Sequence, residues 1–172
     1  MTADAPEPTA PQHLTAAHDV SAFDSGAPDL DDWLRKRALG NEETGASRTY
    51  VVCAAGRVVG YYALAAGGVA QAQAPGRIRS NMPDPVPVMI LARLAVDRGW
   101  QGQSLGSSLL RDAVLRTLQA AEIGGIRAIL VDAISEDAKR FYERLGFRES
   151  PIDPMVLMIT VADARKALGA GS

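Results

Sequence analysis

Apolar side chains recur at the spacing of an α-helix in residues 28–43 and 104–123, and a third stretch, residues 135–143, lies between a capping serine and a glycine. A recurrence every three to four residues places such side chains on one face of a helix. The first stretch opens with Pro28, which is favoured in the first turn, and the third opens with Ser135, whose hydroxyl can cap a helix. The second is followed by two consecutive glycines, which end helices. We therefore predict three helices at these positions.

Five other stretches are β-rich, namely residues 49–55, 57–66, 88–96, 126–131 and 155–161. The first two are joined by a glycine-containing turn, which predicts an antiparallel hairpin. The third is a near-continuous apolar run, which predicts a strand at the centre of the sheet, buried on both faces. It is followed by a predicted helix and another strand, the pattern of a strand–helix–strand crossover. The expected fold class is α/β (α+β), with a mixed, mostly antiparallel central sheet flanked by helices.

Length and composition suit one globular domain, since the chain has 172 residues, of which 47% are hydrophobic. No apolar run approaches the roughly 20 residues of a membrane helix, and the N-terminus lacks the layout of a signal peptide. We expect no membrane association and a cytoplasmic location. The single cysteine argues against a disulfide framework and a cysteine-rich zinc site, so no metal is expected. The proline-rich residues 1–11 are expected to be flexible, and residues 70–87 to form a long loop.

Charge is distributed unevenly along the chain, although the net charge is only −2. Residues 1–34 contain seven acids and no Lys or Arg, so the remainder holds 18 basic and 13 acidic residues, a net charge of +5. An arginine-rich body is compatible with phosphate-bearing ligands. This observation does not choose between a cofactor and a nucleic acid, and ordinary solvated surface charge explains it equally well.

The segment that carries chemistry is residues 98–106, a glycine-bearing loop between the central strand and the second predicted helix. Unpaired backbone N–H groups and the helix dipole make such a junction an anion site, suited to a pyrophosphate. The spacing of its glycines fits neither the Gly-x-x-x-x-Gly-Lys pattern of nucleoside triphosphatases nor the Gly-x-Gly-x-x-Gly pattern of dinucleotide folds.

The same segment resembles the pyrophosphate loop of the GNAT N-acetyltransferases, Gln/Arg-x-x-Gly-x-Gly/Ala, which here reads Gln-Gly-Gln-Ser-Leu-Gly over residues 101–106. The preceding Leu-Ala-Val-Asp at 94–97 is similar to the splayed central strand of that family, and residues 138–147 resemble its second signature, Phe-Tyr-x-x-x-Gly-Phe. The resemblance implies a single GNAT-type domain over residues 12–168, a tail at 169–172, and acetyl-CoA as acetyl donor. The cofactor-binding residues that it implies are Leu94, Ala95, Val96, Gln101, Gly102, Gln103, Ser104, Leu105, Gly106 and Ser107.

One residue departs from the family pattern: Ser104 stands where the family usually has glycine. Its Cβ can crowd a diphosphate, while its hydroxyl can donate a hydrogen bond to one. We expect Ser104 to weaken cofactor binding without abolishing it.

Four segments, residues 23–26, 30–34, 91–97 and 150–155, resemble one branch of the family, the GNAT toxins of bacterial toxin–antitoxin pairs. That branch implies acetylation of the α-amino group of aminoacyl-tRNA, which blocks translation, a ribbon-helix-helix antitoxin as partner, and a homodimer. The alternatives are an N-acetyltransferase of a small-molecule amine or a protein N-terminus, and a non-catalytic acyl-CoA-binding regulator.

Tyr142 is the candidate catalytic residue, because by resemblance it occupies the position of the family's general acid. A tyrosine hydroxyl can protonate the departing thiolate, although Tyr142 could instead simply pack beside Phe141. An α-amine titrates near pH 8 and needs no strong base. His13 and His18 lie far in sequence from the loop and are interpreted as structural or exposed.

Several other side chains have two interpretations each. The possible contacts to tRNA or phosphate are Arg35, Lys36, Arg77, Arg79 and Arg93, with plain solvated charge as the alternative for the first four. Arg93, the one charge in the central strand, could instead form a structural ion pair. Trp33 is expected in the core rather than as a platform for a base, and Cys53 as a small buried hydrophobe rather than a nucleophile.

Overall fold

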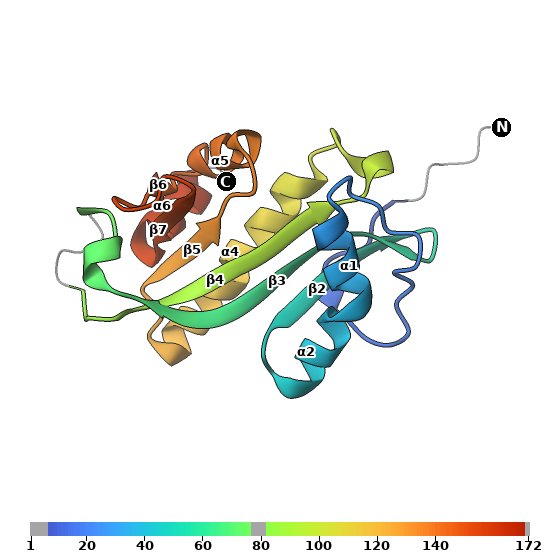
Figure 1. Cartoon of the computed structure of the whole chain (residues 1–172), viewed down its shortest axis with the longest axis horizontal. Helices are drawn as coiled ribbons and strands as arrows, with labels where there is room; N and C mark the ends of the chain where they lie inside the picture. Colours follow the sequence, from blue (N-terminus) through green and yellow to red (C-terminus); the bar gives the residue numbers. More distant parts are fainter. Residues whose placement is uncertain (1–6, 77–81, 171–172) are drawn as a thin grey trace. The chain divides into compact units, whose positions relative to one another are not determined.

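The computed structural model describes residues 7–76 and 82–170 (Figure 1). Its strands are β1 (Gln12–His13), β2 (Arg48–Ala54), β3 (Arg57–Val69), β4 (Val86–Val96), β5 (Ala128–Asp132), β6 (Arg148–Glu149) and β7 (Val156–Thr160). Its α-helices are α1 (Pro28–Lys36), α2 (Ala38–Thr44), α4 (Leu105–Gly124), α5 (Glu136–Glu143) and α6 (Val161–Ala170), with short 3-10 helices η1 (Gln71–Gln73) and η2 (Arg98–Trp100). The strands form a sheet in the order β1-β2-β3-β4-β5-β7-β6.

Two compact units divide the chain. The first comprises Met1–Leu64 with Arg93–Asp112, and the second comprises Ala65–Ala92 with Ala113–Ser172. Strands β3 and β4 and helix α4 each contribute residues to both units.

The first unit contains the predicted hairpin. Ala54 pairs with Arg57 in the antiparallel β2–β3 ladder. The two residues between them, Ala55 and Gly56, have φ values of +52° and +78°. Positive φ at both central positions is the type I′ turn that matches the twist of a two-residue hairpin.

The core of this unit is aromatic. The Trp33 ring stacks on Tyr61 at a centroid distance of 6.0 Å, and Phe23 meets the same tyrosine edge-on at 5.5 Å. Trp33 is only 8% exposed, which confirms its expected place in the core. The Tyr61 hydroxyl donates to the carbonyl of Leu30 at 2.6 Å, so the strand and helix α1 are joined by both packing and a hydrogen bond.

The single helix predicted over residues 28–43 is in fact two helices, α1 and α2, separated at Arg37. Arg37 has a non-helical φ of −126°, yet its N–H still donates to the carbonyl of Trp33, and its own carbonyl accepts from Asn41. Because these bonds persist, Leu34 and Ala38 both remain buried across the break. Hydrophobic periodicity therefore continues through the kink and could not reveal it.

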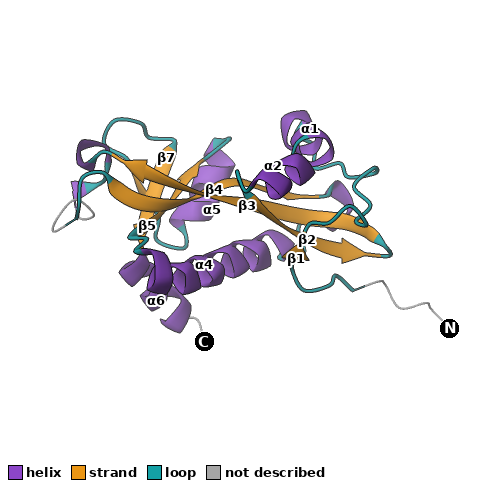
Figure 2. Cartoon of the chain, turned by 90° about the horizontal axis from the view of Figure 1, so that it is seen from below, coloured by secondary structure: helices purple, strands orange, loops and turns teal. Residues whose placement is uncertain are grey.

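In the second unit, β4 and β5 run parallel, with Val88 opposite Ala128 and Leu91 opposite Val131. This confirms the strand–helix–strand crossover. Strand β7 pairs antiparallel with β5 and β6. Figure 2 shows α6 beside the later turns of α4.

Strand β4 holds the central position in the sheet that the sequence predicts, but it is not fully buried along its length. Complete burial is confined to Val86, Val88, Leu91 and Ala95, whereas Ala92 is exposed. The other residues of the strand are half-buried or exposed, although most of them are apolar. Burial of that kind cannot be distinguished from full burial by composition.

The end of the chain also differs from the predicted strand over 155–161. Strand β7 ends at Thr160, and helix α6 begins at Val161. The Thr160 hydroxyl accepts a hydrogen bond from the Asp163 N–H at 2.9 Å, which ends the strand and caps the helix. The two-residue strands β1 and β6 were not predicted either, because such short pairings have no periodicity. Of the predicted N-terminal segment, residues 1–6 lie outside the described part, and Thr9 hydrogen-bonds to Cys53 of β2.

Candidate functional site

The predicted pyrophosphate loop connects the end of β4 to the start of α4. It passes through η2 and then turns at Gly102 and Ser104, with φ values of +79° and +65°. The Ser104 carbonyl accepts from the Ser108 N–H at 3.1 Å, which opens the helix. Residues 101–104 are exposed, and so is Ser107 in the first helical turn, so this segment is open to a ligand.

Asp97 holds the base of this loop in place. Its carboxylate accepts from the Gly99 N–H at 3.0 Å and from the Asp24 N–H at 3.1 Å, and the side chain is only 6% exposed. The neighbouring Arg98 N–H donates to the Asp24 carbonyl at 2.8 Å. Sequence reasoning did not single out Asp97, although an acid directly before a glycine-bearing loop is a recognisable capping position.

Gln101 anchors the other side of the loop. Its amide nitrogen donates to the carbonyls of Ser25 and Val96, both at 2.8 Å. The side-chain amide of Gln101, one of the predicted cofactor residues, therefore holds the loop against residues 23–26. The donors for an anionic ligand are then the backbone N–H groups of the loop and the helix start.

Close packing sets the position of the start of α4. A Cβ on Gly60 of β3 would lie 3.1 Å from Leu109 Cδ1 and 3.3 Å from Leu105 Cδ2. Such contacts are tighter than normal, so glycine at this position lets the helix approach the strand. Leu105 is accordingly buried, whereas Gly106 and Ser107 remain at least partly accessible.

Ser104 adopts the left-handed backbone conformation that glycine tolerates best. A non-glycine residue at φ +65° is uncommon, with a cost of about 1–2 kcal/mol. This provides a physical reason for the glycine that the family usually has at this position. The loop keeps its turn here despite the Cβ. The exposed helix start beside it fits an anionic group, although Ser104 is strained.

The strand before the loop is splayed from its parallel neighbour. The register between β4 and β5 ends at Leu91 opposite Val131, whereas β4 continues to Val96. Ala95 is buried, while Leu94 and Val96 are half-buried. The last residues of β4 lie beyond the paired segment, the feature expected for a strand whose free backbone groups bind an extended ligand arm.

Tyr142 lies in the second unit, on α5. The hydroxyl of Ser135 accepts from the Ala138 N–H at 3.1 Å and caps this helix as predicted. Tyr142 is 6% exposed and packs against Phe141 and Phe147, with ring centroids at 5.1 and 5.7 Å. Burial raises the pKa of Tyr142 to about 12. Its phenol therefore stays protonated at neutral pH, as a proton donor must.

The basic residues proposed for phosphate contacts have other partners. Arg35 donates to the Phe23 carbonyl at 2.7 Å, and Lys36 lies 3.8 Å from Asp32. The Arg93 guanidinium lies 4.3 Å from the centroid of the Trp33 ring, a cation–π contact that the sequence analysis did not consider. Arg77 and Arg79 lie outside the described residues.

The remaining titratable side chains considered from sequence have local roles. The His18 ring accepts from the Thr15 N–H at 2.8 Å, and the His13 ring lies 3.2 Å from a Glu42 carboxylate oxygen. Cys53 is half-buried against the core of the first unit, and burial raises the pKa of its thiol. A raised pKa disfavours the thiolate, so Cys53 is a poor nucleophile.

Within residues 7–76 and 82–170, we looked for membrane-spanning helices and for groups of metal-binding side chains. Within these ranges no helix is both long and apolar enough to cross a membrane. In the same part of the chain, no three His, Cys, Asp or Glu side chains gather in a way that could hold a metal ion.

Comparison with known proteins agrees with the loop geometry. The model of the acetyltransferase (GNAT) domain matches residues 45–149. The tRNA-acetylating toxin of Mycobacterium tuberculosis is 57% identical over 161 residues, which cover 94% of this chain and 97% of the relative. The solved structure of AtaT complexed with acetyl-methionyl-tRNAfMet has a TM-score of 0.86 and 27% identity, covering 94% of this chain and 99% of that one. AtaTR bound with AcCoA has a TM-score of 0.78 and 26% identity, covering 96% and 99% of the two chains. The chain belongs to the GNAT acetyltransferase family.

Proposed function

We propose that this protein is an acetyl-CoA-dependent N-acetyltransferase toxin that acetylates the α-amino group of aminoacyl-tRNA and thereby blocks translation. The observation that carries the proposal is the 57% identity to a tRNA-acetylating toxin over 94% of the chain. The similarity to AtaT, solved with an acetylated aminoacyl-tRNA, supports the same substrate class.

In this proposal, the loop and the splayed strand bind acetyl-CoA, which supplies an activated thioester. The backbone N–H groups of residues 102–107 bind the diphosphate, since this segment is mostly exposed and leads into a helix start. Leu94, Ala95 and Val96 lie along the extended pantetheine arm. Gln101 acts through the loop, which it holds to Ser25 and Val96.

Tyr142 is proposed to supply a proton to the leaving group. The substrate amine forms a bond to the acetyl carbon, the carbon–sulfur bond breaks, and the thiolate takes the phenolic proton. The acetylated amine loses one proton to solvent, and the phenolate takes one proton back from solvent, so the enzyme is regenerated. The support from this chain is that Tyr142 is buried and its pKa is raised, so the phenol is fully protonated at pH 7.

The chemistry of an aminoacyl ester suits an enzyme without a strong base. An α-amino group has a pKa near 8 in peptides, and a lower one when its carboxyl group is esterified. A substantial fraction of the amine is then an uncharged nucleophile at neutral pH. The two histidines, which are engaged near the N-terminus, are not required.

We further propose a cytoplasmic location, a ribbon-helix-helix antitoxin as partner, and a homodimer. The support is the toxin branch itself, since solved relatives include the complex of AtaT with AtaR bound to DNA. The domain is proposed to span residues 12–168. Among the described residues predicted to contact tRNA, Lys36 has the most exposed side chain, at 71%.

The test is transfer of labelled acetyl groups from acetyl-CoA to total charged tRNA, with deacylated tRNA and free amino acids as parallel acceptors. We expect label only on charged tRNA. Acetylation of free amines or of a protein N-terminus instead would replace the proposed substrate. Acetyl-CoA binding without thiol release on any acceptor would identify a non-catalytic binding protein.

A further inference from the structure

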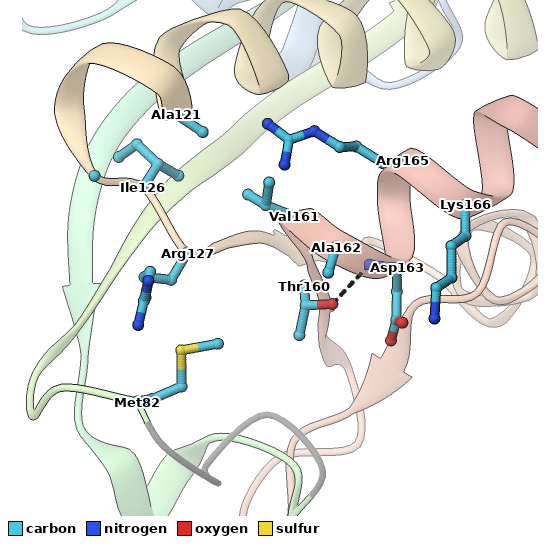
Figure 3. Close-up of a pocket in the computed structure, with 11 residues that line it drawn as sticks. Met82, Ala121, Ile126, Arg127, Thr160, Val161, Ala162, Asp163, Arg165 and Lys166 are labelled. Carbon is cyan, nitrogen blue, oxygen red and sulfur yellow. Dashed lines mark hydrogen bonds between the residues drawn. The ribbon is translucent and has the colours of Figure 1, made fainter.

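A pocket of about 610 Å³ lies in the second unit, at the beginning of β5 and of α6 (Figure 3). Among the described residues, three cationic side chains line it, Arg127, Arg165 and Lys166, together with one carboxylate, Asp163. The described part of the lining therefore carries a formal charge of +2. None of these residues was singled out from the sequence, because Arg127 lies about forty positions before Arg165 and Lys166, and two adjacent basic residues are too few to form a basic run.

The cations are available to a ligand. Arg127 and Lys166 are exposed, and in the described part of the chain no carboxylate lies within ion-pair distance of either. Arg165 lies 3.9 Å from Glu122, but both side chains are at least half exposed, so this pair contributes little. In Figure 3 the Arg165 side chain extends from α6 toward Ala121, and Arg127 projects from the segment before β5.

Backbone hydrogen bonds hold together the two segments that carry these side chains. The Val161 N–H donates to the Arg127 carbonyl at 2.9 Å, which ties the first residue of α6 to the segment before β5. The Arg127 N–H donates to the Pro87 carbonyl at 2.9 Å. Arg127 and Arg165 therefore project from a rigid frame rather than from a loose loop.

The pocket lies away from the proposed acid. Strand β5 has five residues and is about 16 Å long, and the pocket is at its beginning, whereas α5 and Tyr142 follow its end. A ligand in this pocket can therefore contribute to binding without touching the phenol. That separation suits an extended polyanion better than a small acceptor.

We propose that this pocket is an auxiliary binding site for backbone phosphates of the RNA substrate, contacted by Arg127, Arg165 and Lys166. The proposal rests on the proposed function for the identity of the RNA. Guanidinium groups pair well with phosphate oxygens, and a volume of about 610 Å³ leaves room for a nucleotide rather than a single ion. The apolar lining residues, among them Met82, Ile126 and Val161, provide a surface for the sugar or base.

The test compares the double substitution Arg127→Gln/Arg165→Gln with Arg148→Gln, a control at an exposed arginine on strand β6 of the same unit. Binding of charged tRNA is measured over a range of salt concentrations. We expect the double substitution to weaken binding roughly tenfold and to reduce the salt slope by about 1–2. The KM for charged tRNA should rise, with kcat and the acetyl-CoA dissociation constant unchanged.

Three results would overturn the site as proposed. The first is an unchanged affinity and salt slope for the double variant. The second is loss of binding to AMP or inorganic phosphate with tRNA binding intact, which would assign the pocket to a free phosphate ligand. The third is loss of antitoxin binding alone, which would assign it to a protein. If the unsubstituted protein binds tRNA at this pocket but acetylates none, the proposed function fails while the site stands.

Discussion

The loop at residues 97–104 and helix α5 place their polar groups in different surroundings. In the loop, a buried carboxylate and a glutamine amide make several hydrogen bonds, and the backbone N–H groups are left exposed. On α5, the Tyr142 phenol is surrounded by aromatic rings, and burial alone raises its pKa. The comparison teaches that hydrogen bonds set the position of the exposed N–H groups in the loop, whereas apolar surroundings keep the Tyr142 phenol protonated.

The largest expected effect comes from removing the Tyr142 hydroxyl. Tyr142→Phe keeps the ring packing against Phe141 and Phe147 and should lower kcat by roughly 10²-fold or more. Acetyl-CoA binding and thermal stability should be unchanged. Single-turnover acetyl transfer measures the effect, and a loss of less than threefold would remove Tyr142 from the mechanism.

Breaking the loop's anchor should act on binding and stability together. Asp97→Ala leaves the Gly99 and Asp24 N–H groups without their acceptor, at a cost of about 1–3 kcal/mol. Urea unfolding should report that loss, and calorimetry should show weaker acetyl-CoA binding. Asp153→Ala is the matched control, since this carboxylate accepts from the Met155 N–H in a loop of the second unit. Equal weakening of acetyl-CoA binding by both substitutions would contradict the anchoring role of Asp97.

A smaller effect of opposite sign is expected from Ser104→Gly. Glycine relieves the left-handed backbone at φ +65°, and its greater freedom in the unfolded chain offsets part of the gain, so stability should rise by up to about 1 kcal/mol. The acetyl-CoA dissociation constant should fall. Ser104→Ala keeps the Cβ and removes the hydroxyl, which separates the two contributions. An unchanged or raised dissociation constant for Ser104→Gly would show that this serine does not weaken binding.

The smallest effect concerns pH. Burial raises the pKa of Tyr142 to about 12, because the folded protein disfavours the ionised phenol. The stability that depends on a protonated phenol is therefore fully present below pH 10 and is lost as pH rises towards 12. Activity should rise as the substrate amine loses its proton and then stay level from about pH 8.5 to 10. A rate profile at saturating acetyl-CoA tests this, and a decline below pH 10 that Tyr142→Phe abolishes would show a lower pKa for the phenol.

Local patterns predicted most of the secondary structure. The hairpin at Ala55 and Gly56, the cap at Ser135 and the end of α4 before Gly125 all depend on residues close in sequence. The break at Arg37 and helix α6 escaped prediction. At Arg37 the hydrophobic spacing continues through the kink. Helix α6 begins with a β-branched valine directly after a strand, so its start, which Thr160 caps, resembles more strand.

The sequence by itself determined the family, the central strand followed by an anion-binding turn, and the departure at Ser104, because each is a short-range pattern of residue types. Only the tertiary structure decided that Ser104 lies at positive φ and that Asp97 and Gln101 hold the loop to residues 23–26. The contact of Arg93 with Trp33, and the place of Arg127 and Arg165 beside one pocket, also depend on the tertiary structure alone. These contacts join residues tens of positions apart, and such pairings are set by the packing of whole elements rather than by any local preference.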